Sequence, residues 1–109
     1  MTRRTRIAKS NGKSIGKMKI RLDPVLDIKA AAPLYALLSS RRGGDLAIDA
    51  SAVERIGGQC LQVLLAARAR WEADQRRFLI EGFSPDVIAT LRLMGIEPAA
   101  FDHRRETDA

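Results

Sequence analysis

The residues most suited to chemistry lie at Gly57-Gly58-Gln59-Cys60, between a strand-like run and a helix-like run. A helix's first turn presents unpaired N–H groups and the positive end of a dipole, so it can hold an anion or activate a thiol. No phosphate-binding lysine follows these glycines, and no base accompanies a nucleophile. Cys60 is favoured as a small packing residue, since no second cysteine exists to resolve its oxidation. The plain alternative is a connection in which Gly57 or Gly58 supplies a positive φ.

The other reactive side chains are scattered along the sequence. Ser51, two residues after Asp49, is a possible phosphate acceptor, although hydrogen bonding within a turn is the favoured role. His103 is the single histidine and falls near the C-terminus, so it offers no Ser-His-Asp or Cys-His pair. No residues have metal-ligand spacing. The sequence therefore predicts no enzyme, no cofactor, no metal site and no small-molecule substrate.

Composition predicts one small domain in a reducing cytoplasm. The chain has 109 residues, of which 46% are hydrophobic, and a single cysteine rules out an internal disulfide. No apolar run approaches the roughly 18 residues that span a bilayer, and the charged N-terminus does not read as a signal peptide. We expect a cytoplasmic protein without membrane insertion.

The net charge of +6 comes from one segment. Residues 1–17 carry six of the 19 basic residues and no acid, so the other 13 basic residues balance all 13 acidic residues. A basic arm can contact phosphates, but this one lacks aromatic residues for stacking, and the rest of the chain has no basic stripe. We therefore expect residues 1–17 to be a disordered tail and nucleic-acid binding to be unlikely.

Hydrophobic periodicity predicts alternating strands and helices between the tails. The expected strands are residues 18–22, 25–28, 46–50 and 77–81, and the expected helices are residues 30–40, 58–73 and 85–94. Pro33 is tolerable only in the first turn of its helix, Ser84 is a helix cap, and Ile96 starts a short edge segment. This order predicts an α/β domain over residues 18–101, with a frayed tail over residues 102–109. Its mixed or parallel sheet has about four to five strands, with helices chiefly on one face.

One local motif resembles a known family. The run "LAIDASAVERIGGQCLQVLLAARARW" (residues 46–71) resembles the signature of STAS domains, the fold of anti-sigma-factor antagonists. The later run "FSPDVIATLRLMGIE" resembles the family's final helix and the glycine step after it. The matching positions of the first run are Asp49, Ser51, Val53, Ile56, Leu61, Leu64 and Leu65. The resemblance covers about residues 18–100 and implies a protein-binding signalling module.

The departure from the family pattern falls on the opening residues. In regulated members a kinase phosphorylates a hydroxyl in the first turn of this helix, but here Gln59 occupies that position. Gly57 stands where the family has Asp, and Cys60 stands where it has Gly. An amide cannot accept phosphate, so the resemblance implies an unmodified docking surface made of Gly57, Gly58, Gln59, Cys60, Gln62 and Val63.

The partner is predicted from the same resemblance. The run from Gly44 to Asp74 is most similar to small stand-alone STAS proteins of alphaproteobacterial chemotaxis clusters, which implies binding to the histidine kinase CheA and modulation of phosphate flow to response regulators. Two alternatives stay open. One is a kinase-switched anti-sigma-factor antagonist that uses Ser51, and the other is the STAS subunit of a lipid-transport ABC system.

Overall fold

The computed structural model describes residues 17–102, and the elements follow the predicted alternation with two additions. The strands are β1 (Lys17–Arg21), β2 (Val25–Leu26), β3 (Asp45–Asp49), β4 (Arg55–Ile56) and β5 (Phe78–Glu81). The helices are α1 (Ile28–Ser39), α2 (Gly58–Ala73), α3 (Pro85–Leu93) and a closing 3₁₀ helix (Pro98–Phe101). Most of the predicted tails, residues 1–16 and 103–109, lie outside the described residues, as does His103. The α/β prediction is confirmed.

The main sheet is three-stranded and parallel, in the order β1-β3-β5. The apolar strand β3 is central. Ile20, Ile48 and Ile80 are register partners in one buried row that faces the helices. Because side chains alternate along a strand, the next row points to the opposite face. That row, Arg21, Asp49 and Glu81, is polar, whereas the preceding row on the same face includes the apolar Ala47 and Leu79. The sheet therefore buries one face under helices and carries its charged residues on the other.

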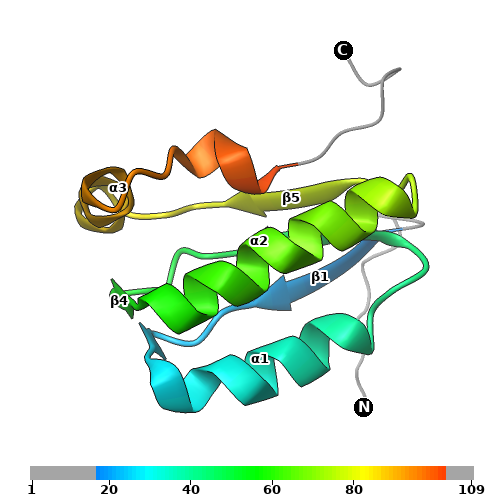
Figure 1. Cartoon of the computed structure of the whole chain (residues 1–109), viewed down its shortest axis with the longest axis horizontal. Helices are drawn as coiled ribbons and strands as arrows, with labels where there is room; N and C mark the ends of the chain where they lie inside the picture. The colour runs from blue at the N-terminus through cyan, green and yellow to red at the C-terminus, as the bar shows by residue number, and fades with distance from the viewer. Residues whose placement is uncertain (1–16, 103–109) are drawn as a thin grey trace, which may run out of the picture.

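A second pair of strands forms outside the main sheet. β2 and β4 pair in parallel, and each has two residues. Gly57 N–H donates to the carbonyl of Leu26 at 2.9 Å and extends this pairing. The predicted connection over residues 51–56 therefore contains a strand, and the predicted single sheet is divided into three strands and two. Each short strand leads directly into a helix, so α1 and α2 start side by side (Figure 1).

Helix α1 begins earlier than its sequence predicted. Asp27 caps it, because the Asp27 carboxylate accepts from the Lys29 N–H at 3.0 Å. Starting at Ile28 places Pro33 beyond the first turn, so the expected placement of this proline was wrong. The Asp27 cap and the burial of Leu34 and Leu38 against the core together offset the missing N–H of Pro33.

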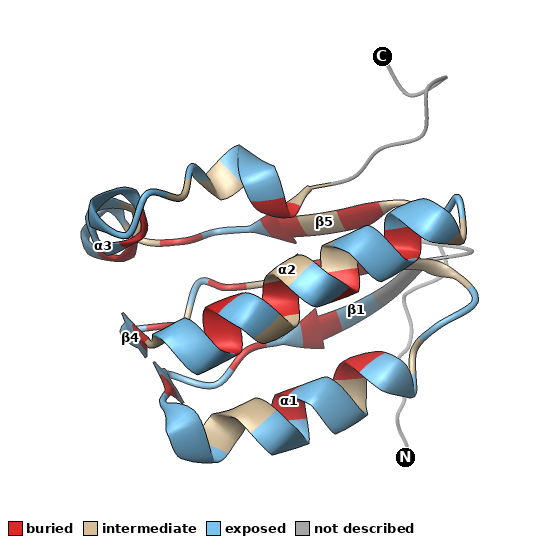
Figure 2. Cartoon of the chain, in the orientation of Figure 1, coloured by how far each residue is buried: buried red, intermediate tan, exposed pale blue. Residues whose placement is uncertain are grey.

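Helix α2 has the predicted bounds and contributes most to the core. Its buried side chains recur at helical spacing and are Cys60, Leu61, Leu64, Ala67 and Trp71. Figure 2 shows this buried stripe on α2, with α1 packed beside it and exposed residues on their outer surfaces. The few large aromatic side chains are used as anchors: Trp71 packs on Phe78, with ring centroids 5.5 Å apart.

The end of the domain folds back on β5. Ser84 caps α3 and Pro85 is its first residue, as predicted. Ile96 does not form an edge strand, because a 3₁₀ helix follows and buries Phe101 instead. Asp102 continues this closure: its carboxylate accepts from the Ile80 N–H at 3.1 Å, and its carbonyl accepts from Arg68 Nε at 3.2 Å.

Candidate functional site

The opening turn, defined here as residues 57–62, starts α2 without a side-chain cap. Gly57 is the N-cap with φ −105° and ψ 173°, which is extended backbone that any residue adopts. Within residues 17–102 the glycines with positive φ are Gly43, Gly82 and Gly95, so the alternative of a positive φ at Gly57 or Gly58 was wrong. A Cβ on Gly57 would lie at an ordinary 3.6 Å from the Leu26 carbonyl oxygen, and one on Gly58 would meet nothing. Backbone conformation therefore does not require these glycines.

Backbone contacts fix the position of the opening turn. Gly57 is held to Leu26 by the β2–β4 ladder, and the Cys60 thiol donates to the carbonyl of Asp27 at 3.4 Å. Leu61 N–H donates to the Gly57 carbonyl at 3.1 Å, which starts the helix. The first turns of α1 and α2 are thus joined at Asp27 and present two positive dipole ends on one surface.

Exposure separates the predicted binding residues into two groups. Gly58, Gln59 and Gln62 are exposed, while Gly57 and Val63 are half-buried. Cys60 is fully buried, so its side chain packs behind the surface and cannot contact a partner directly. Burial, and to a lesser degree the nearby Asp27, raises the pKa of the Cys60 thiol. This direction opposes activation of the thiol and agrees with a packing role.

The alternative phosphate acceptor Ser51 is part of a turn. Asp49 accepts from the Ser51 N–H at 2.9 Å. Hydrogen bonds from Ser51, first from its side chain and then from its backbone, lower the pKa of the Asp49 carboxyl, and Arg21 at 3.9 Å acts in the same direction. Gly82, at φ +93°, packs against this turn, where a Cβ would come within 3.3 Å of Ser51 N. A phosphate on Ser51 would add about −1.5 to −2 charges beside a carboxylate.

Two exposed apolar side chains adjoin the opening turn and were not predicted as part of it. Ile28 is 70% exposed and Val25 is 41% exposed. Both flank Asp27, the residue that the Cys60 thiol contacts. The sequence signal was present in Val25, Leu26 and Ile28, but assigning residues 25–28 to a strand hid the outward position of Ile28. These side chains add hydrophobic area beside the uncharged first turn of α2, with the exposed charged residues Asp27 and Lys29 next to Ile28.

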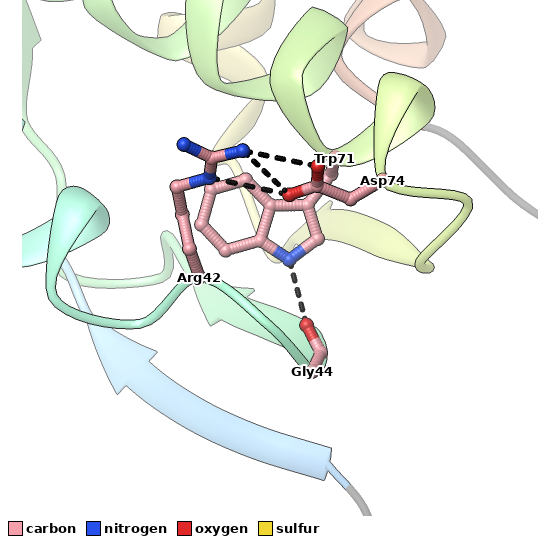
Figure 3. A network of polar contacts seen from close by, with 4 residues as sticks. All are labelled: Arg42, Gly44, Trp71 and Asp74. Atoms are coloured by element: carbon pink, nitrogen blue, oxygen red, sulfur yellow. Dashed lines mark hydrogen bonds and ion pairs between the residues drawn. The ribbon is translucent and has the colours of Figure 1, made fainter.

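The opposite end of the helix pair is tied by side chains. The closing network consists of Arg42, Gly44, Trp71 and Asp74 (Figure 3). Arg42 makes a forked contact with Asp74, from Nη2 at 3.0 Å and from Nε at 3.2 Å. Trp71 Nε1 donates to the Gly44 carbonyl at 2.8 Å. The hydrogen bonds from Arg42 lower the pKa of the Asp74 carboxyl. This network connects the end of α1 to the end of α2.

Neither a metal cluster nor a membrane span is found over residues 17–102. No group of three or more His, Cys, Asp and Glu side chains in this range could hold a metal ion. No helix in the same range is long and apolar enough to cross a membrane.

Comparison with known proteins assigns the family. The curated proteins provide no match to the chain. Residues 11–98 match the family described as "Mlab, STAS domain", a range that includes β1 to α3 and the opening turn. Domains of this kind are generally non-catalytic modules that bind and regulate other proteins. The match spans most of the 109 residues, and the chain belongs to the STAS domain family.

Proposed function

We propose that this STAS domain binds its protein partner through the opening turn and the adjoining start of α1. The observation that carries this proposal is a neutral first helical turn, with Gly58, Gln59 and Gln62 exposed. Gly57 and Val63 complete the surface at its half-buried edges, and Cys60 supports it from behind. Ile28, 70% exposed beside the turn, supplies the apolar contact that interfaces concentrate at their centre.

Because Gln59 cannot be phosphorylated, this surface is not switched on or off by a phosphate at this position. A phosphate at a helix N-terminus changes the local charge by about −1.5 to −2 and can switch a partner on or off. The amide of Gln59 accepts no phosphate and instead offers both a donor and an acceptor. A domain with this residue has a fixed binding surface, which suits an adaptor better than a phosphorylation switch.

We further propose that the partner is the histidine kinase CheA of a chemotaxis system, where binding modulates phosphate flow to the response regulators. The support is the resemblance of residues 44–74 to stand-alone STAS proteins of such systems, together with the missing phosphate acceptor. An anti-sigma kinase and the ATPase of a lipid-transport ABC system are the competing partners. Binding to each of the three kinds of partner is testable with purified protein, since no test requires an enzymatic assay of this chain.

The test is calorimetric titration of the full chain against a purified CheA, anti-sigma kinase and ABC ATPase from the same genome. We expect saturable binding to CheA. The Gln59→Glu variant should bind more weakly by roughly ten-fold or more, because it places an uncompensated charge in the interface. Gln75→Glu makes the same chemical change at the far end of α2, where Gln75 follows the helix, and should leave binding unchanged.

Each result has a distinct meaning. Binding only to the anti-sigma kinase or only to the ATPase would overturn the CheA assignment and keep the docking surface. Undiminished binding of Gln59→Glu would remove the opening turn from the interface. Incubation with ATP and the kinase, followed by intact mass measurement, checks whether the protein stays unphosphorylated. Phosphate on Ser51 would favour the kinase-switched alternative.

A further inference from the structure

A second surface feature lies away from the opening turn, between α1 and α2. It is a hollow of about 40 Å³ with mostly apolar walls, which include Leu38, Val63 and Trp71. It reaches the surface between Tyr35 and Ala66, both of which are exposed. One water molecule needs roughly 10–15 Å³ on this measure, so the hollow has room for the end of one aliphatic side chain.

The rim of the hollow is positively charged at one end. Arg42 and Arg70 line it, and no acidic residue does. Arg42 also engages the carboxylate of Asp74 through its fork. Arg70 acts on the same carboxylate, since it too lowers the pKa of Asp74. The residues that line the hollow thus carry two positive charges and no negative charge.

The wall formed by α1 is unusually free of charge. Residues 30–40 contain no charged side chain, although 29% of the whole chain is charged. Exposed residues on this stretch include Ala32, Tyr35, Ala36 and Ser39. Tyrosine is enriched at interfaces and charged residues are depleted from their cores, although serine and alanine are depleted there as well. The exposed wall is therefore uncharged, with Tyr35 as its large exposed side chain.

We propose that the groove between α1 and α2 docks an acidic amphipathic helix of a partner protein, with one aliphatic side chain in the hollow and carboxylates at the Arg42–Arg70 rim. Helix-in-groove recognition requires an apolar anchor and a complementary rim, and the groove offers both. A second copy of this chain fits less well, because it would bring a second set of these arginines to the same rim. The proposal does not depend on docking at the opening turn; the two surfaces share only Val63.

Trp71 provides a built-in reporter for this groove. It is the only tryptophan of the chain, it lines the hollow, and it is 1% exposed. The probe is a synthetic helix with leucines on one face and glutamates on the other. Its twin carries lysines in place of the glutamates. We expect the acidic helix to change the fluorescence of Trp71 saturably in the full chain, whereas the lysine twin has no effect.

Three variants locate the binding. Ala66→Glu places a carboxylate at the exposed edge of the hollow and should weaken binding of the acidic helix roughly ten-fold or more. Arg70→Gln removes one rim charge and should weaken it about two- to five-fold, with a smaller salt dependence. Arg55→Gln makes the same change on exposed β4, outside the groove, and should bind like the parent.

The outcomes that overturn the proposal are equally specific. An equal Trp71 response to the acidic helix and its lysine twin would contradict recognition by charge. No response at saturating peptide would show that the groove does not bind such a helix. If the fluorescence of Trp71 changed with protein concentration in the absence of peptide, the groove would bind a second copy of this chain instead. Amide NMR shifts from the acidic helix that avoid Val63, Ala66 and Arg70 would place the binding elsewhere.

Discussion

The two ends of the α1–α2 pair are joined in different ways. At the closing network, side chains make the connection: a forked Arg42–Asp74 ion pair and an indole hydrogen bond to the Gly44 carbonyl. At the opening turn the connection is backbone pairing plus one thiol contact from Cys60, and the N-cap Gly57 makes no side-chain bond. The comparison teaches that one end uses its side chains to hold the fold, while the other leaves Gln59 and Gln62 exposed to solvent.

The largest effect is expected from Trp71→Ala. This change removes a 1%-exposed side chain and its hydrogen bond, so it should lower the free energy of unfolding by about 3–5 kcal/mol. Denaturant unfolding followed by far-UV circular dichroism measures it. Trp71→Phe keeps a ring beside Phe78 but leaves the Gly44 carbonyl without its donor, at a cost of about 1–3 kcal/mol. A loss below about 1 kcal/mol for Trp71→Ala would show that the closing network does not hold the helices.

A smaller loss is expected at the other end from Cys60→Ala. The variant removes a buried sulfur and its contact with the Asp27 carbonyl at 3.4 Å, for a loss of about 1 kcal/mol. Cys60→Ser, which keeps a donor, separates the hydrogen bond from the packing. The same denaturant titration applies. If Cys60→Ala proved as costly as Trp71→Ala, both ends would be tied equally and the comparison would fail.

Gln59→Glu should leave stability unchanged or raise it slightly. A carboxylate in the first turn of α2 interacts favourably with the helix dipole, by about 0.3–1 kcal/mol. Gln75→Glu lies past the end of the same helix and gains no such stabilisation. Thermal melts of both variants in low salt make the comparison. A clear drop in the melting temperature for Gln59→Glu would mean that its amide makes structural contacts, so any binding defect of that variant would need reinterpretation.

The smallest effect on stability is expected from lowering the pH. Hydrogen bonds from Arg42 hold the pKa of Asp74 below its ordinary value of 3.8, so the folded state keeps this carboxylate charged where the unfolded chain protonates it. The stabilisation is fully present above the unfolded pKa of 3.8 and is lost as pH falls below it and through the lower pKa of the folded state. Unfolding measured across these pH values should lose less stability with falling pH in Asp74→Asn. The matched variant Asp49→Asn applies the same test at the strand ends, where the pKa is also lowered. Identical acid profiles for Asp74→Asn and the parent would contradict a contribution from the closing network.

Much of the fold was predictable because its signals are local. The bounds of α2 follow from helical spacing between Gly58 and Ala73, and the start of α3 follows from the cap at Ser84. β4 was missed because two residues carry no periodicity, and its pairing with β2 depends on a contact between distant parts of the sequence. The start of α1 was misplaced because the Asp27 cap competed with a strand pattern that includes Ile28.

The candidate site was predictable in location and only partly in detail. The resemblance to STAS domains and the glycines at the strand-to-helix junction both indicated the opening turn. Gly58, Gln59 and Gln62 are exposed there. The inward position of Cys60 agrees with the packing role that the sequence favoured, and it follows the helical spacing of Leu64 and Ala67. The closing network was not predicted, because residues 32 apart in the sequence, Arg42 and Asp74, meet only once both helices have formed.

The all-parallel strand pairing has a consequence for the order in which the chain is made. Every pair, β1–β3, β2–β4 and β3–β5, joins strands separated by at least one helix, so no strand can find its partner until a crossover has been synthesised. As the chain leaves the ribosome, β3 can pair with β1, but its second edge stays open until Phe78–Glu81 emerges. During that interval the apolar β3 is the segment most exposed to wrong partners in the cell.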